Sequence, residues 1–269
     1  MVFSTPLGFI PIGSVLTFWF GFLLISLFTF KIGSFTFWQP YPKTSFQVQL
    51  SGTIDTTVKA KVFILNGLNI DQGTISTLQG LSRKVVCQVS LGTVSQGTED
   101  YDVLTPGLLG NQLPNGDYYA DIRSPSVMRI MENRLDAMAA KNCDAVDGTF
   151  VDSWARDSGF SIVAEDQLRY NLWIVNSAHS LGLSIGLHGD ADQVSDLDDY
   201  YDFAVTESCY ANKECEKFLP FIEEGKAVFN IEYNTSSKDK VQICEYANEM
   251  DLSIDIKSLQ LGSDYQACQ

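Results

Sequence analysis

The sequence has little histidine, little positive charge and none of the short motifs that bind nucleotides or activate a serine. Its 269 residues include 2 histidines, and 18 lysines and arginines stand against 33 aspartates and glutamates, for a net charge of −15. This charge repels a phosphate backbone, so nucleic acid is not expected as a partner. It either favours neutral or cationic partners or serves solubility.

Cofactor and metal motifs are absent from the sequence as well. No GxGxxG or P-loop sequence follows the first predicted strand, and no GxSxG elbow occurs. With two histidines and no CxxC pair, a zinc site is not expected. We therefore expect neither a cofactor nor a metal.

The chain does contain a long hydrophobic run near its start. Residues 7–30 carry no charge and are long enough to span a bilayer, which takes ~20 apolar residues. The run lacks the basic n-region and small-residue cleavage site of a good signal peptide, which slightly favours an uncleaved anchor over a secreted mature form. The sequence thus divides into a signal-anchor or signal segment, 1–31, and a large domain, 32–269.

Six cysteines behind a targeting segment suggest an oxidising compartment, and therefore an extracytoplasmic domain. Cys209 and Cys215 would close a short loop, and Cys244 with Cys268 would staple the last helix and strand to the C-terminus. Spacing alone does not establish connectivity, because six cysteines allow about 15 pairings.

From residue 47 onward, short apolar runs alternate with segments of helical period, as in a parallel sheet wrapped by helices. Eight runs predict strands, over residues 47–52, 61–67, 84–92, 144–152, 183–190, 202–208, 226–233 and 251–257. Helices are expected over residues 125–141, 165–181, 212–224 and 237–250. This α/β pattern fits a (β/α)8 TIM barrel, and an open doubly wound sheet is the alternative. The stretch 93–123 is long for a connector, so we expect it to be functional.

Polar side chains gather at the C-terminal ends of the predicted strands, where such barrels carry their reactive groups. They are Asn66, Asn69, Ser90, Asp147, Asp152, His188, Asp190, Glu207 and Glu232. A ring of carboxylates without metal ligands favours glycoside hydrolysis, in which one carboxyl protonates the leaving oxygen and another attacks or activates water.

The fourth predicted strand supplies two of these carboxylates. Strand alternation turns Asp147 and Thr149 toward the barrel interior and Gly148 and Phe150 toward the helices, with Asp152 just past the end. Asp147 and Asp152 are therefore catalytic candidates, although Asp147 could instead be a buried carboxylate held by its neighbours.

Glu207, at the end of the sixth strand, is the third catalytic candidate, and a function is favoured over a surface role. The substrate-binding candidates are Asp190, His188, Glu232, Thr149 and Trp154. Each has a structural alternative: His188 could be a satisfied structural histidine, Trp154 a core residue instead of a sugar platform, and Glu232 a strand cap.

Several segments together resemble the barrel of glycoside hydrolase family 114. They include "WQPYPKTSFQVQLSGTID" (38–55), "DIRSPSVMRIMENRLDAMAAKNCDAV" (121–146), "SGFSIVAEDQLRYNLWIVNSAHSLGLSIGLHGD" (158–190) and "YDFAVTESCYANKECEKFLPFIEEGKAVFNIEYN" (201–234). The family comprises endo-α-1,4-polygalactosaminidases, and its fungal members are often labelled α-galactosidases. The resemblance implies a TIM barrel and a galactosamine-containing polysaccharide substrate, which is cationic where deacetylated and suits an acidic protein.

The resemblance also shows where this chain departs from its relatives. They read Glu-Pro-Asp-Asn-Val-Asp on strand four, and the middle aspartate forms the catalytic pair with the strand-six glutamate. Here residues 147–152 read Asp-Gly-Thr-Phe-Val-Asp, so Thr149 stands at the aspartate position, whereas Glu207 is retained. A neutral hydroxyl cannot act as a carboxylate nucleophile.

Two hypotheses follow from this substitution. In the favoured one the chain is a glycosidase with Glu207 as general acid, and Asp147 or Asp152 takes the place of the missing aspartate. In the other it is a catalytically inactive carbohydrate-binding barrel. The first has a geometric difficulty, because Asp147 lies two residues, or ~6.5 Å, deeper along the strand.

Overall fold

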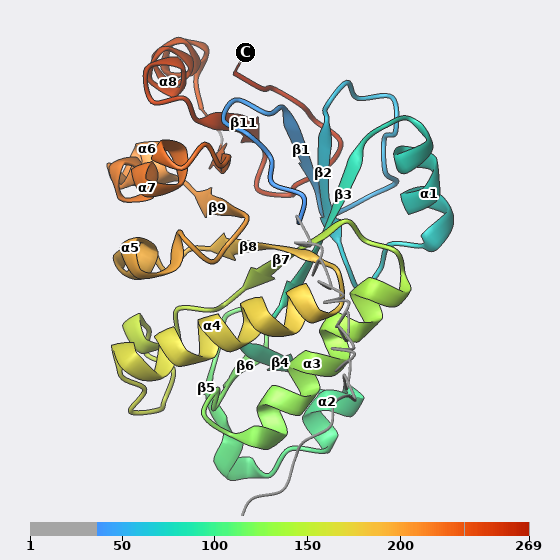
Figure 1. Ribbon diagram of the computed structural model, residues 1–269, viewed down its shortest axis with the longest axis vertical. Coiled ribbons are helices and arrows are strands. Elements are labelled where there is room, and N and C mark those ends of the chain that lie inside the picture. The colour runs from blue at the N-terminus through green and yellow to red at the C-terminus, as the bar shows by residue number, and fades with distance from the viewer. Residues whose placement is uncertain (1–36, 234, 269) are drawn as a thin grey trace, which may run out of the picture. The chain divides into compact units, whose positions relative to one another are not determined.

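The computed structural model describes residues 37–233 and 235–268, so the hydrophobic run lies outside the described residues. Eight parallel strands form one sheet, in the order in which they occur along the chain. They are β1 (Phe46–Gln49), β2 (Val62–Asn66), β3 (Lys84–Ser90), β7 (Ala145–Thr149), β8 (Ser184–His188), β9 (Phe203–Glu207), β10 (Val228–Tyr233) and β11 (Ser253–Lys257). The predicted (β/α)8 barrel is confirmed, with helices outside the strands (Figure 1).

The helices are α1 (Gln72–Gly80), α2 (Glu99–Asp102), α3 (Pro125–Ala140), α4 (Ala164–Ser180), α5 (Val194–Leu197), α6 (Cys209–Asn212), α7 (Leu219–Glu223) and α8 (Ser237–Glu249). Local sequence sets their starts. The Ser124 hydroxyl caps α3, whose first residue is Pro125, and Ser236 and Asp239 form a capping box at α8. Among the described helices, none is long and apolar enough to cross a membrane.

Two expectations about local structure are wrong. The helix predicted over 212–224 is broken into α6, the short 3-10 helix Cys215–Phe218 and α7, because Lys213 takes a left-handed φ of 60° inside a loop that Cys209 and Cys215 close. The second concerns the stretch 93–123, for which no strands were predicted. It folds into a three-stranded antiparallel sheet of β4 (Thr93–Ser95), β6 (Asp117–Ala120) and β5 (Leu109–Gln112).

Strand alternation divides the core into two layers. One face of each strand fills the barrel interior, with Phe46, Val48, Ile64, Phe203 and Phe229 among its buried residues. The opposite face packs against the helices in a larger apolar cluster. Because one barrel end is thus plugged by apolar side chains, the polar residues at the carboxyl ends of the strands lie above a closed floor.

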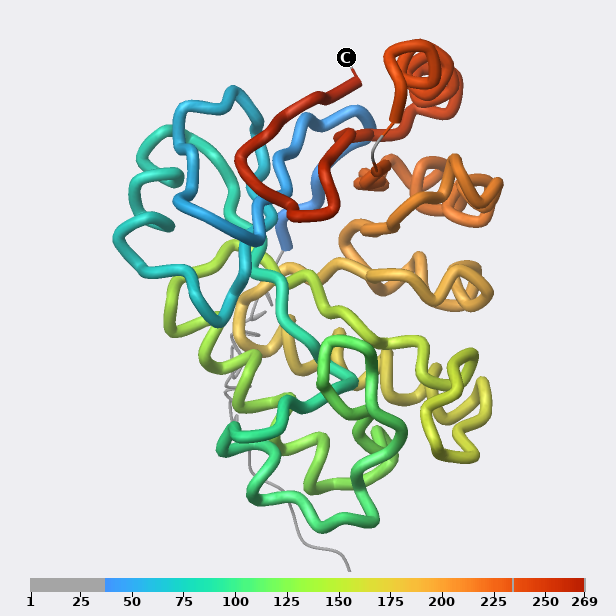
Figure 2. The backbone as a smooth tube through the Cα atoms, turned by 180° about the vertical axis from the view of Figure 1, so that it is seen from behind, coloured from blue at the N-terminus to red at the C-terminus, as the bar shows by residue number. Residues whose placement is uncertain are grey.

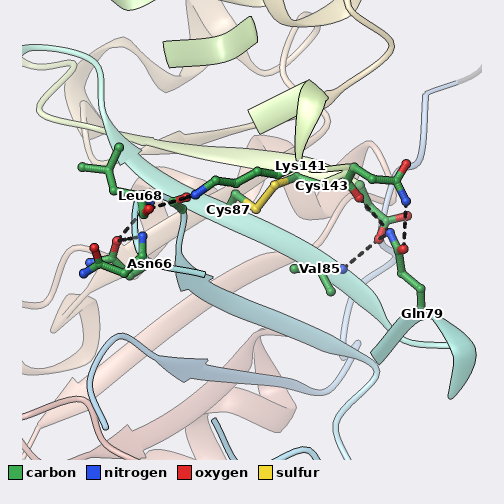
Figure 3. Close-up of a disulfide and its surroundings, with 11 residues drawn as sticks. Asn66, Leu68, Gln79, Val85, Cys87, Lys141 and Cys143 are labelled. Carbon is green, nitrogen blue, oxygen red and sulfur yellow. Dashed lines mark hydrogen bonds between the residues drawn. A yellow bond between two sulfur atoms is a disulfide. The ribbon is translucent and has the colours of Figure 1, made fainter. Parts of the chain in front are cut away.

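Three disulfides cross-link the domain: Cys87–Cys143, Cys209–Cys215 and Cys244–Cys268. The two short-range pairings are those expected from spacing. Cys87 on β3 is joined to Cys143 beyond α3, and nearby the Lys141 ammonium donates to the carbonyls of Gly67 and Leu68 (Figure 3). These bonds fix the α3–β7 loop against β3, and so fix the start of the strand that carries Asp147.

The C-terminal tail fills the seam between the first and last strands, which share no ladder of their own in the described sheet. On one side the carbonyl of Leu261 accepts from Leu50 and Ser51; on the other, Gln266 and Cys268 exchange backbone hydrogen bonds with β11. The tail accordingly runs beside β1 (Figure 2). Lys257 is buried in this seam, where its ammonium donates to Gln47 Oε1 at 3.0 Å.

Candidate active site

A pocket of about 680 Å³ opens at the carboxyl ends of β3, β7, β8 and β9. Its wall includes five of the site residues predicted from the sequence: Thr149, Asp152, His188, Asp190 and Glu207. At its mouth Lys217 bridges Asp192 and Glu214 at 2.8 and 3.2 Å. Within the described residues, no group of histidine, cysteine and carboxylate side chains could hold a metal.

Glu207 is the last residue of β9 and carries a reachable carboxylate, with 43% of its side chain exposed. Its Oε2 accepts a hydrogen bond from the Tyr233 hydroxyl at 2.8 Å, and its Oε1 lies 3.6 Å from His188 Nε2. Burial raises the pKa of Glu207, but the hydrogen bond and charge of His188, with the Tyr233 hydroxyl, outweigh it and hold the pKa below its usual value. The group is therefore an anion at neutral pH.

Asp147 lies beneath this carboxylate and is fully buried. Its Oδ1 is 2.9 Å from His188 Nδ1, and its Oδ2 accepts from Gln88 Nε2 at 2.8 Å. Both oxygens are thus occupied by side chains on the adjacent strands β3 and β8. The position is the interior one expected from alternation, but a substrate in the pocket cannot touch Asp147.

His188, at the end of β8, lies between the two carboxylates, and each ring nitrogen faces one of them. Burial alone would lower its pKa. The charge of Asp147 and the hydrogen bonds with Asp147 and Glu207 outweigh burial and raise the pKa to about 10. His188 is therefore a cation that lies between the carboxyl groups of Asp147 and Glu207.

Asp152 and Asp190 form the other acidic part of the pocket. Asp152 is ion-paired with Arg156 at 2.5 Å and is 8% exposed. Asp190 accepts from Trp154 Nε1 and Asn171 Nδ2, both at 2.8 Å. Burial raises the pKa of Asp190 to about 7. The hydrogen bond from Trp154 opposes this shift, and the charge of Asp152 adds to it.

Two of the sequence-predicted binding residues lie outside the pocket wall. The indole of Trp154 is turned to Asp190 and packs against the core, and the residue orients that carboxylate. Glu232 is buried, and its Oε1 accepts from the Tyr210 backbone and from Asn230 Nδ2. It holds the loop that follows β9, next to the Cys209–Cys215 disulfide.

The pocket also contains residues that sequence reasoning missed. Gln88 lines the pocket near the end of β3, and Tyr233, which ends β10, lies outside the pocket wall and donates to Glu207; the strand-end rule could have found both. Tyr119 comes from the antiparallel sheet, which was not predicted. Phe150 was expected to face the helices, but it lines the pocket, because β7 ends at Thr149 and Phe150 takes a left-handed φ of 59° that breaks the alternation.

The comparisons with known proteins identify the family. The model of glycoside hydrolase family GH114 matches residues 31–269. The chain belongs to glycoside hydrolase family 114. No curated protein sequence matched the chain.

Solved structures of similar proteins agree with this assignment. The family 114 chain is 30% identical to Ega3 of Aspergillus fumigatus, a structure described as a complex with galactosamine; the match covers 88% of this chain and 100% of Ega3, with a TM-score of 0.82. It is 10% identical to the glycoside hydrolase domain of PelA from Pseudomonas aeruginosa, over 83% of this chain and 98% of that one, with a TM-score of 0.68. The second likeness concerns the fold alone.

Thr149 stands at the position where the resemblance to family 114 predicts an aspartate. Thr149 ends β7, in register with Ser90 on β3, and its side chain shares the pocket with Glu207. Neither of the two nearby aspartates occupies its place: Asp147 is sealed below, and Asp152 is paired with Arg156.

Proposed function

We propose that the chain hydrolyses an α-linked polysaccharide containing galactosamine or galactose in this pocket, with Glu207 as the ionised carboxylate. One observation carries the proposal: Glu207 reaches the pocket while His188 and Tyr233 hold it as an anion. Membership of family 114 and the likeness to Ega3, which was crystallised with galactosamine, support the substrate class. The net charge of −15 suits a polymer with free amino groups.

The ionised state determines the role assigned to Glu207. A general acid must carry a proton, so the lowered pKa favours Glu207 as the group that takes a proton from water or stabilises the oxocarbenium-like transition state. This assignment differs from the general acid expected from the sequence. Asp147 is buried and stays a partner of His188.

The leaving oxygen then needs a proton from a second group. Asp190 lines the same pocket just beyond the end of β8, the strand next to that of Glu207, and its pKa of about 7 leaves part of it protonated near neutral pH. We assign it as the donor: water adds to the anomeric carbon and gives its proton to Glu207, while the glycosidic oxygen leaves with the proton of Asp190.

A second candidate function is carbohydrate binding without hydrolysis. It is favoured by Thr149, which supplies no carboxylate, and by the inaccessibility of Asp147. For the cellular location, three disulfides favour an oxidising, extracytoplasmic compartment, reached as a secreted protein or held at a membrane by the run 7–30.

The full-length chain, purified in detergent, can be assayed on α-1,4-linked galactosamine oligosaccharides by measuring new reducing ends. Glu207→Gln is expected to abolish release, while Glu249→Gln, a matched change on the exposed end of α8, leaves it unchanged. Equal release by the wild type and Glu207→Gln would refute the assignment. Retention of the oligosaccharide without cleavage by the wild type would instead support the binding function.

Thr149→Asp places a second carboxylate in the pocket. If the site hydrolyses the polymer, this change is expected to raise the rate by about a hundredfold, the contribution of one positioned acid or base. The control is Ser51→Asp, which places a carboxylate at a hydroxyl residue on the exposed surface. Thr93→Asp would not serve, because Thr93 is buried and a charge there would destabilise the fold. An unchanged rate in Thr149→Asp would show that the missing aspartate does not limit catalysis.

A further inference from the structure

An aromatic corner forms one wall of the pocket. Tyr119 comes from β6 of the antiparallel sheet and Phe150 follows β7, and both line the pocket. Their rings meet edge to face, with centroids 6.3 Å apart and an interplanar angle of 84°. Residues separated by 31 positions in the sequence thus meet at one point of the pocket wall.

The backbone of Phe150 is unusual for a bulky residue. Its φ of 59° lies in the left-handed region, which asparagine and glycine adopt more readily than phenylalanine. The backbone passes close to Gly92, where an added Cβ would lie 1.8 Å from the Phe150 carbonyl oxygen, so the chain has little freedom to relax. Backbone geometry alone therefore disfavours phenylalanine here, and the position of its ring calls for another explanation.

Tyr119 presents a polar atom at the same corner. The residue is 7% exposed, and among the described residues its hydroxyl has no hydrogen-bond partner. Burial and the charge of Asp152 raise its pKa, so the hydroxyl stays protonated and can donate. The hydroxyl is not among the side-chain atoms that are buried without a partner, so it opens to the pocket, where a ligand or water can accept from it.

We propose that Tyr119 and Phe150 form a subsite for one pyranose residue of the bound polysaccharide. The apolar face of the sugar ring packs against Phe150, and a sugar oxygen accepts from the Tyr119 hydroxyl, with the Asp152 carboxylate close by for a hydroxyl or ammonium group. The subsite rests on the proposed polysaccharide ligand, but it requires no hydrolysis.

Binding of an α-1,4-linked galactosamine oligosaccharide can be measured by calorimetry on the full-length chain, in a Glu207→Gln background so that the ligand stays intact. Adding Phe150→Asn is expected to weaken binding about tenfold, because the ring is lost, while Tm stays equal or rises, because asparagine relieves the left-handed conformation. Lys43→Asn, which relieves the same conformation at φ 61° outside the pocket, is expected to leave the affinity unchanged.

Tyr119→Phe tests the hydroxyl without removing a ring. It is expected to weaken binding about three- to tenfold at unchanged Tm, whereas Tyr118→Phe on the same strand leaves binding unaltered. Binding by Phe150→Asn and Tyr119→Phe as tight as that of the parent would overturn the subsite and leave the proposed function standing. Failure of the folded parent to bind any oligosaccharide would overturn both.

Discussion

Replacing His188 with glutamine is expected to raise the pKa of Glu207 and to move the acidic limb of the pH–rate profile toward neutral pH. Hydrolysis needs the Glu207 anion, so activity falls as the pH drops through the pKa of Glu207. His188 lowers that pKa by placing a positive charge 3.6 Å from Glu207 Oε1. Glutamine removes the charge, yet its amide can still donate to Asp147.

The size of the shift can be worked from the distance. Two unit charges 3.6 Å apart interact by about 4.6 kcal/mol at an effective dielectric of ~20, and by about 1 kcal/mol in water. Because 43% of the Glu207 side chain is exposed, the lower part of this range applies. At about 1.4 kcal/mol per pKa unit, the limb should move up by roughly one to two pH units.

Two measurements check the reasoning. The first is the rate of reducing-end release against pH for the wild type, His188→Gln and the control His179→Gln, whose histidine pairs with Asp202. The second is proton NMR of the two histidines, in which His188 should remain an imidazolium to about pH 10. A His188 resonance that titrates near its ordinary pKa of 6.5, or an acidic limb that stays in place in His188→Gln, would refute the proposed charge arrangement.

Three further outcomes concern stability. The pKa of His188 in the folded protein lies above its ordinary value of 6.5. The stabilisation that protonated His188 gives the fold is therefore complete below pH 6.5 and is lost as the pH rises through about 10. Measured by chemical denaturation, the free energy of unfolding should fall less over this pH window in His188→Gln than in the wild type. Replacing Cys244 and Cys268 with serine should lower the free energy of unfolding by about 3 kcal/mol, and an unchanged value would mean that the tail docks without its tether. Lys257→Met should cost about 3 kcal/mol, because the oxygens of Gln47, Gly262 and Asp264 would lose their buried donor; a melting temperature equal to that of the wild type would contradict this.

The barrel could be predicted because each of its strands is a short apolar run that is visible in the sequence. Each of the eight predicted runs overlaps one parallel strand, since buried strands at this spacing need continuous apolar segments separated by helices. The antiparallel sheet was missed because β4, β5 and β6 have only 3 or 4 residues each, too few for an alternation pattern to be recognised. The break in the 212–224 helix depends on a single left-handed residue, Lys213, in a disulfide loop.

The site was predictable where side chains sit on regular strands and less so beyond them. Alternation turns Asp147 and Thr149 inward and brings them into register with neighbours on β3. Past the last strand residue the period no longer applies, so the sequence could not show that Phe150 turns into the pocket or that Trp154 turns to Asp190. Nor could it show that burial and paired donors make Asp147 inaccessible, because this depends on His188 and Gln88 from separate strands.

The tail in the β1–β11 seam affects the order in which the domain can be completed during synthesis. Residues 261–268 contact both the first and the last strand of the barrel, so the barrel cannot close until this segment has left the ribosome. Until then, β1 and β11 lack their hydrogen bonds with the tail, and the Lys257 ammonium lacks the carbonyls of Gly262 and Asp264. Whatever follows this closing segment must leave it free to dock, and removing residues 261–268 would leave an open, edge-exposed sheet.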